Sequence, residues 1–223
     1  MRACVREAAE RAGRQPEEIT ILAATKYLTP ADMPALVQAG ITDLAENRLE
    51  SLAEKQAAVE TGSALSDPAR WHFIGELQSR KVAQIAGLVD CIHTLCSSSA
   101  AGRLARIVED AGEIPDLMVQ VNISEDPVKH GLLPHEVAQF LDELPASLCI
   151  AGFMTMPAFV ENAEENRGAF AALHELVEQE RERFAGRHTL RWLSMGTSQD
   201  FAVAVEEGAT HVRLGRILYA EQE

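Results

Sequence analysis

The sequence predicts an α/β fold, a single-domain (β/α)8 TIM barrel with an extra helix at its N-terminus. Eight short apolar runs alternate with segments whose apolar residues recur at helical spacing. The runs are continuously apolar, which is typical of parallel strands covered on both faces. A doubly wound open sheet has the same local pattern and is the main alternative. With 223 residues and 47% hydrophobic content, residues 1–223 suffice for one domain with one core.

The first half of the chain contains the leading helix and four of the predicted strands. Apolar residues at helical spacing indicate a helix over residues 2–12, which ends at Gly13. The predicted strands are residues 19–26, 42–47, 71–75 and 91–95. Helices are expected over residues 29–40 and 49–60 and from residue 79, with a polar loop up to Pro68. Each strand is thus followed by a helix.

The second half continues the same alternation. Its predicted strands are residues 116–122, 149–154, 191–195 and 211–214. Helices are expected over residues 100–111, from Pro134, and over residues 164–184 and 199–207. Closure of the barrel would make the eighth strand the neighbour of the first.

Charge and cysteine content narrow the function classes. Lys and Arg total 20 against 34 Asp and Glu, and this net charge of −14 works against non-specific binding to nucleic acid or anionic membranes. No apolar stretch is long enough to span a bilayer, and the first residues lack the apolar core of a signal peptide, so a cytoplasmic protein is expected. The four cysteines form no C-x-x-C pair and are expected to be reduced, with Cys91 and Cys149 packed as small hydrophobic residues. No structural metal is expected.

Barrel closure would bring Lys26, at the end of the first strand, beside Arg213 and Gly215 after the eighth. Phosphate groups commonly lie at the loops after strands seven and eight of such barrels, where Gly196 and Ser198 are available, the latter also as a helix cap. Desolvation beside Arg213 would lower the pKa of Lys26, and a neutral amine adds to an aldehyde. A phosphate-bearing aldehyde held as a Schiff base is one interpretation. The other is an ordinary exposed lysine and an ordinary helix cap.

Residues 71–81, with the sequence WHFIGELQSRK, resemble the signature of the YggS/PROSC family of pyridoxal-phosphate-binding proteins. Further matching segments follow in order through nearly the whole chain, namely residues 25–26, 46–47, 120–122, 152–157, 193–196 and 212–215. The resemblance implies a barrel like the N-terminal domain of alanine racemase, with pyridoxal 5′-phosphate (PLP) bound to Lys26 as a Schiff base. It places Arg213 at the pyridine nitrogen and Asn47 and Met154 near the ring. The phosphate would be held by Ser194, Gly196, Thr197, Ser198 and Gly215.

The function implied is PLP (vitamin B6) homeostasis or delivery rather than catalysis. A fixed cation at the pyridine nitrogen disfavours its protonation and weakens the ring as an electron sink. The β-domain that supplies a second base in racemases is not expected here, because the sequence ends at Glu223, just after the eighth predicted strand. PLP-dependent apoenzymes are the expected recipients, and a monomer is expected. Leu28 stands where the family often has a second lysine, so an exchange role for that lysine is in doubt.

Three other functions remain open from the sequence. A PLP-dependent amino-acid racemase with weak activity would need a base such as His93 or Tyr27. A metal hydrolase could use His72, His93 and His211 at a barrel mouth, with Glu46 or Asp90 as carboxylate ligands. The acidic segments 161–165 and 175–182 would suit a partner-binding protein, although such charge runs are usually solvated faces.

Overall fold

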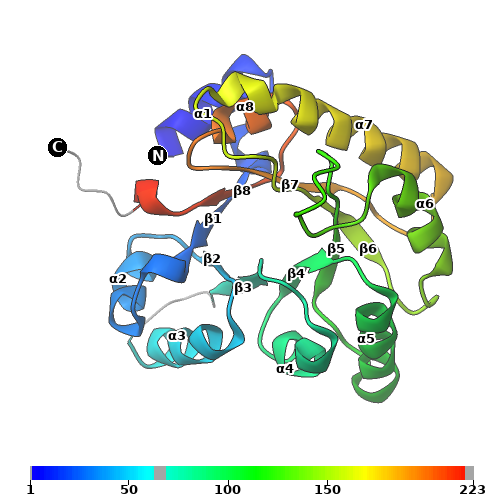
Figure 1. Ribbon diagram of the computed structural model, residues 1–223. Helices are drawn as coiled ribbons and strands as arrows, with labels where there is room; N and C mark the ends of the chain where they lie inside the picture. Colours follow the sequence, from blue (N-terminus) through cyan, green and yellow to red (C-terminus); the bar gives the residue numbers. More distant parts are fainter. Residues whose placement is uncertain (1, 63–68, 219–223) are drawn as a thin grey trace.

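The computed structural model describes residues 2–62 and 69–218, and its strands form a closed parallel barrel (Figure 1). The strands follow each other around the barrel in chain order, and β8 pairs with β1. The strands are β1 (Thr20–Ala24), β2 (Asp43–Glu46), β3 (Arg70–Phe73), β4 (Cys91–Leu95), β5 (Asp116–Gln120), β6 (Ile150–Met154), β7 (Trp192–Thr197) and β8 (His211–Leu214). The predicted barrel is confirmed, and the open-sheet alternative is wrong.

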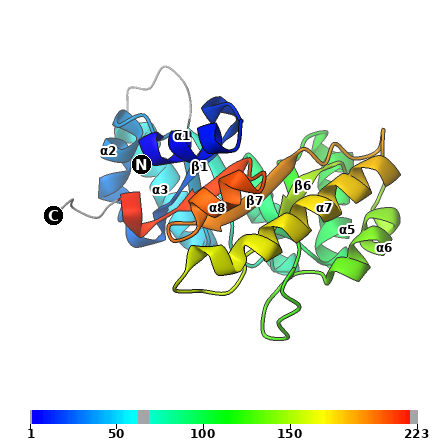
Figure 2. The same ribbon diagram turned by 90° about the horizontal axis from the view of Figure 1, so that it is seen from above.

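The helices surround the strands, as both views of the ribbon show (Figures 1 and 2). They are α1 (Arg2–Arg11), α2 (Met33–Gln38), α3 (Leu49–Gly62), α4 (Val82–Ala86), α5 (Ser98–Ala111), α6 (Pro134–Glu143), α7 (Arg167–Arg183) and α8 (Phe201–Glu206). The extra helix α1 packs against α8 on the outside of the barrel, near the place where β8 pairs with β1. The loop predicted up to Pro68 falls on residues 63–68, outside the described ranges.

Local sequence signals explain where the helices begin and end, as α5 illustrates. The Ser97 hydroxyl accepts a hydrogen bond from the Ala100 amide at 3.3 Å and so caps the first turn. Gly112 ends the helix with a φ of 78°, a conformation that costs glycine little. The apolar face between these ends, including Leu104, is buried against the barrel.

The barrel interior is more polar than the layered apolar interior typical of this fold. Five polar side chains from four strands are almost completely buried, namely His72, His93, Ser194, His211 and Arg213. The apolar core lies mainly between the strands and the surrounding helices. Burying polar groups is costly unless each has a hydrogen-bond partner, so this interior needs a specific arrangement of hydrogen bonds.

One of two sequence expectations about cysteine side chains is corrected here. Cys91 is buried as expected, but Cys149 is exposed, because β6 begins one residue after it and Cys149 lies outside the packed strand. Both have free thiols.

Among the described helices, none is both long and apolar enough to cross a lipid bilayer.

Candidate functional site

A cavity of about 280 Å³ lies at the carboxyl ends of β1, β7 and β8. It brings together five of the predicted site residues, which are Lys26, Thr197, Ser198, Arg213 and Gly215. The remaining wall includes Tyr27, named from the sequence only as a possible racemase base, and residues that the sequence did not single out as site residues: Ala24, Ile74, Met156, Pro157, Phe159, Gln199 and Asp200. The cavity therefore combines two cations with a loop rich in hydroxyl groups and an apolar rim.

Lys26 lies on a short 3-10 turn, Thr25–Tyr27, that follows β1. Its side chain is exposed, and its Nζ atom is 5.1 Å from the centre of the Tyr27 ring. The expectation of a lysine desolvated at a strand end is therefore wrong for this structure, because β1 stops at Ala24, two residues earlier. The amine nevertheless faces the cavity that Arg213 also lines.

A buried ion pair supports this turn. Lys55, on α3, is 2% exposed and donates hydrogen bonds to the Thr25 carbonyl oxygen at 2.7 Å and to the Glu46 carboxylate. The same carboxylate accepts from the Thr25 hydroxyl at 3.0 Å and from the Asn47 amide at 2.8 Å. Every member of the group has a partner, so the backbone just before Lys26 is fixed by a fully satisfied buried network.

Arg213 is 4% exposed and lines the cavity from the side of the barrel interior. Its Nη1 donates to the Ser194 carbonyl oxygen and to the Ser194 hydroxyl, both at 2.8 Å, and its Nη2 donates to the Thr155 carbonyl oxygen at 2.8 Å. Burial lowers the pKa of Arg213 to about 10, although the charge of Asp200 acts in the opposite direction. Within the described residues, no carboxylate lies within ion-pair distance of this guanidinium.

Asp200 fixes the end of β7 and the loop that follows it by accepting hydrogen bonds. The Thr197 amide and hydroxyl both donate to its carboxylate, at 2.7 and 3.0 Å, and Asn166 donates to it from α7's amino end at 2.8 Å. Gly196 has a φ of 88°, and a Cβ there would lie 2.5 Å from the Ala204 Cβ, so only glycine fits this close approach to α8. The loop geometry is therefore set by protein contacts.

Ser198 does not cap α8, contrary to expectation, because Asp200 occupies the N-cap position. Its hydroxyl instead accepts a hydrogen bond from the Gly215 amide at 3.1 Å, which joins the loop after β7 to the loop after β8. The Ser198 hydroxyl proton has no acceptor among the described residues, so it remains available to a ligand.

Ser194, Met154 and Asn47, which were also predicted as site residues, do not line the cavity. Ser194 is fully buried beneath Arg213, and Met154, the last residue of β6, is 1% exposed. Asn47 is exposed just after β2. A ring position near Asn47 or Met154 stays a prediction.

The histidines named for a metal site do converge, but inside the barrel. His72, His93 and His211 have ring centroids 5.2 to 6.2 Å apart, and Cys91 joins His72 and His93 in a group whose potential ligand atoms lie within 4.8 Å. Burial raises the pKa of the Cys91 thiol well above its usual range, which disfavours the thiolate that binds metals. His72 Nδ1 and His93 Nε2 already share a hydrogen bond of 3.0 Å.

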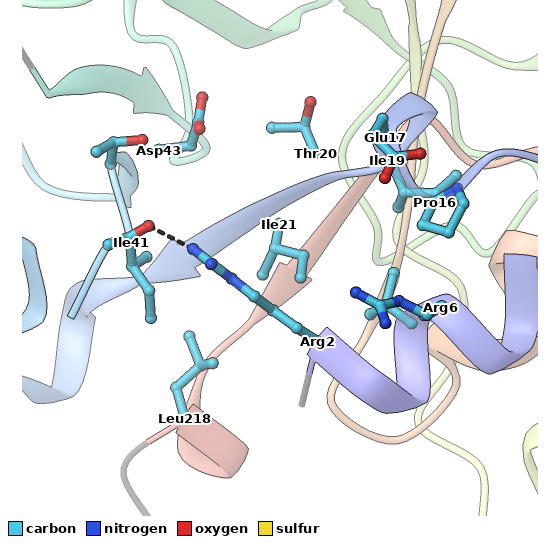
Figure 3. A pocket seen from close by; sticks show the side chains of 13 residues that line it. Arg2, Arg6, Pro16, Glu17, Ile19, Thr20, Ile21, Ile41, Asp43 and Leu218 are labelled. Atoms are coloured by element: carbon cyan, nitrogen blue, oxygen red, sulfur yellow. Dashed lines mark hydrogen bonds between the residues drawn. The ribbon is translucent and has the colours of Figure 1, made fainter. Parts of the chain in front are cut away.

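A larger cavity, of about 430 Å³, lies between α1 and the amino-terminal ends of β1 and β2 (Figure 3). Arg2 and Arg6 reach into it from α1, and Asp43 stands at its far side (Figure 3). Arg2 donates a hydrogen bond to the Gly40 carbonyl oxygen. None of the nine predicted site residues lines this cavity, so its size does not make it the candidate site.

Comparison with known proteins identifies the family. No family model matches the chain. The chain is 32% identical over 222 residues to the pyridoxal phosphate homeostasis protein of Aquifex aeolicus, covering 98% of this chain and 94% of that protein. It is 35% identical over 224 residues to the protein of the same name from Pseudomonas aeruginosa, covering 98% and 91%. The chain belongs to the family of pyridoxal phosphate homeostasis proteins.

Solved structures of similar proteins agree with this family and with the barrel. PipY of Synechococcus elongatus, solved without PLP, superposes with a TM-score of 0.83 at 31% identity, covering 97% of this chain and 99% of PipY. The structure of PipY with PLP bound superposes with a TM-score of 0.80 at 29% identity, covering 97% and 100%. Alanine racemase of Clostridium difficile superposes with a TM-score of 0.71 at 16% identity, and the match covers 99% of this chain and 55% of the enzyme. This last likeness shows only that the fold is shared.

Proposed function

We propose that this member of the family binds pyridoxal 5′-phosphate in the cavity at the carboxyl ends of β1, β7 and β8, as a PLP homeostasis or delivery protein. The observation that carries the proposal is Arg213, a buried guanidinium without a carboxylate partner in the described structure, on the wall of a cavity that also contains an accessible lysine. Such a site favours a ligand with an aldehyde for the lysine and an acceptor or anion for the arginine. The PLP-bound structure of PipY supports this choice of ligand.

The residues present fit the parts of this ligand. Lys26 Nζ would attack the aldehyde carbon, with loss of one water, to give the Schiff base. Thr197, Ser198 and the backbone around Gly196 and Gly215 would bind the phosphate, since the loops after β7 and β8 meet there through the Ser198–Gly215 hydrogen bond. Ser194 would act beneath this site through Arg213 rather than as a direct ligand.

Arg213 would face the pyridine nitrogen, and this position argues for binding rather than catalysis. Its three hydrogen bonds to oxygen atoms of Ser194 and Thr155 hold the cation in place, so a proton on the pyridine nitrogen would be repelled. PLP supplies an electron sink for carbanion chemistry when its ring nitrogen is protonated, and this site disfavours that form. The names of the relatives, all homeostasis proteins, favour the same reading.

A weak racemase is the second candidate, because Tyr27 lines the same cavity as Lys26 and carries an ionisable hydroxyl. Its ring lies against Lys26 on the same turn, whereas a two-base racemase needs its second base on the opposite face of the substrate. His93, the other base considered, is completely buried inside the barrel. Exchange of the alanine α-proton for deuterium at a rate above that of free PLP would favour the racemase.

The test of the proposal is a titration of the purified protein with PLP, followed by visible absorbance. Wild type is expected to develop the band of a protonated Schiff base, and Lys26→Ala to give only the spectrum of free PLP. Lys81→Ala is the matched control, because Lys81 pairs with Glu50 outside the cavity. A Schiff-base band of equal intensity in Lys26→Ala would contradict the assignment.

Delivery to PLP-dependent apoenzymes and a monomeric state belong to the same proposal. One chain supplies every residue of the cavity, so a second copy is not needed to complete it. Size-exclusion chromatography over a dilution series is expected to give the monomer mass throughout. Mixing a PLP-dependent apoenzyme with the PLP-loaded protein is expected to restore the apoenzyme's activity faster than mixing it with an equal concentration of PLP bound to a non-specific carrier.

A further inference from the structure

Five side chains form one continuous row of hydrogen bonds through the barrel interior. Arg213 donates to the Ser194 hydroxyl at 2.8 Å, and the Ser194 Oγ lies 2.9 Å from His93 Nδ1. His93 Nε2 lies 3.0 Å from His72 Nδ1, and His72 Nε2 lies 3.3 Å from the Asp43 carboxylate. The row begins at the carboxyl end of β8, beside the candidate PLP site, and ends at the first residue of β2.

The two ends of this row fix the direction of every bond in it. Arg213 can only donate, so its bond uses a lone pair of the Ser194 hydroxyl oxygen. Among the described residues, His93 Nδ1 is the acceptor available for the Ser194 proton. At the other end, the Asp43 carboxylate can only accept when ionised, so His72 Nε2 donates to it.

The two histidines between these ends are then determined as well. His93 accepts through Nδ1 and must carry its proton on Nε2, which donates to His72 Nδ1. His72 in turn carries its proton on Nε2, so each ring has one proton and both of its nitrogens are used. The reverse direction would leave the Ser194 proton without an acceptor in a fully buried position, which is costly.

The electrostatic environment agrees with this arrangement. Burial lowers the pKa of His93 well below its usual value, and the charge of Arg213 acts in the same direction, so the ring carries one proton at neutral pH. Burial alone would raise the pKa of Asp43, but the hydrogen bond from His72 and the nearby charge of Arg70 hold it below its usual value. The row therefore joins a buried cation to an ionised carboxylate through neutral groups.

We propose that Asp43, His72 and His93 are positioning residues for Arg213, and that they act by holding the Ser194 hydroxyl as an acceptor toward its guanidinium. The inference rests on the proposed PLP site. Without His93, the Ser194 hydroxyl is free to rotate, and one of the three bonds that orient Arg213 weakens. Asp43 also lines the cavity beside α1 (Figure 3). A change in the hydrogen bonding of Asp43 at that cavity therefore alters the orientation of Arg213 at the PLP site.

The direct test uses the protein without PLP, so it does not depend on the proposed function. Histidines labelled with ¹⁵N report by NMR which ring nitrogen carries the proton. The expected result is a proton on Nε2 of both His93 and His72, with His93 neutral at pH 7. A proton on Nδ1 of His93 would overturn the inference, whatever the result of PLP binding.

The second test compares substituted proteins loaded with PLP. His93→Leu and Asp43→Leu are expected to bind PLP about tenfold more weakly, the effect of one lost hydrogen bond, and to shift the visible band. Asp43→Asn keeps an acceptor for His72 and is expected to restore affinity and band to near wild type. His211→Leu is the control, because His211 is also a buried histidine of the barrel interior but bonds Thr210, outside the row.

The possible outcomes distinguish the proposed PLP-binding function from the positioning role of Asp43, His72 and His93. Absence of a Schiff base in wild type contradicts the proposed function, while the NMR result still decides the direction of the row. If wild type binds PLP and His93→Leu, Asp43→Leu and His211→Leu all lose affinity equally, the effect is general destabilisation, and the positioning role is wrong. Unchanged affinity and an unchanged band in folded Asp43→Leu would also overturn it.

Discussion

At the scale of single residues, Lys55 is the side chain on which the cavity depends without belonging to it. Its ammonium group lies under the turn that carries Lys26 and is enclosed by the Thr25 carbonyl oxygen and the Glu46 carboxylate. Lys55 is 2% exposed and Glu46 is 1% exposed, so neither charge can be compensated by water if the other is removed. Buried pairs of this kind are much more costly to break than to keep.

Lys55→Met is therefore expected to lower the free energy of unfolding by about 3–5 kcal/mol, because Glu46 is left as an unpaired buried charge. Urea denaturation measures this change. Lys81→Met removes an exposed pair with Glu50 and is expected to have little effect, since water screens both groups. Equal stabilities of the two variants would contradict the role given to Lys55.

The cysteines give a second test at this scale. Cys149 is exposed, whereas Cys91 is buried and its thiol has a pKa raised well above its usual range by that burial. A thiol reagent at pH 8 is expected to modify Cys149 within minutes and Cys91 only after unfolding. Peptide mapping identifies the modified sites, and early modification of Cys91 would show that the barrel opens at β4.

At the scale of elements, the junction of β7 with α8 sets the shape of the candidate phosphate loop. Gly196 has a positive φ and packs directly on α8, while Asp200 holds Thr197 through two hydrogen bonds. The loop is thus arranged before any ligand binds. A loop that needs no rearrangement loses less conformational entropy on binding.

Gly196→Ala is expected to destabilise the protein by about 1–3 kcal/mol and to weaken PLP binding, because its Cβ would lie 2.5 Å from the Ala204 Cβ at an unfavourable φ. Gly168→Ala is the matched control. Gly168 lies on α7 with open space around it, so this change is expected to stabilise the helix slightly. Thermal unfolding with and without PLP compares them, and equal behaviour would contradict the packing argument.

Sequence patterns predicted the elements better than the fine structure of the site. Continuous apolar runs predict the strands because parallel strands are covered on both faces. Barrel closure and the family resemblance led to Lys26, Arg213 and the loops after β7 and β8, which the structure brings to one cavity. The strand ends were less accurate: β1 stops two residues before Lys26, which leaves its side chain exposed.

Two networks were missed for a physical reason. Lys55 and its helical neighbours resemble a solvated face, and only the packing of α3 on β2 reveals that the lysine is buried. The hydrogen-bonded row from Asp43 to Arg213 takes one residue from each of five strands, β2, β3, β4, β7 and β8. No local spacing encodes such a row, because its members meet only when the barrel closes.

At the scale of the whole molecule, the polar interior links stability to pH. Burial lowers the pKa of His211 to about 3 and that of His93 well below its usual value, so both remain neutral in the folded protein. In the unfolded chain both take up a proton near pH 6.5. The unfolded state therefore binds more protons as the pH falls, and stability is lost in that direction.

The free energy of unfolding is accordingly expected to be nearly constant above about pH 7 and to fall by a few kcal/mol between about pH 6.5 and pH 4. Urea denaturation across this range measures it. In His211→Leu the slope is expected to be shallower, because one of the two titrating groups is absent. A wild-type stability that does not change between pH 7 and pH 4 would contradict a neutral, buried histidine cluster.

The central claim is that this barrel holds PLP on Lys26, and the most direct measurement is reduction with borohydride followed by peptide mapping. Incubation of the wild-type protein with PLP, reduction and mass analysis is expected to find the pyridoxyl-phosphate group on the peptide that contains Lys26. The adduct is expected to be absent from the peptides that contain Lys55 and Lys81. A modified Lys81 with an unmodified Lys26, or no adduct at all, would contradict the account.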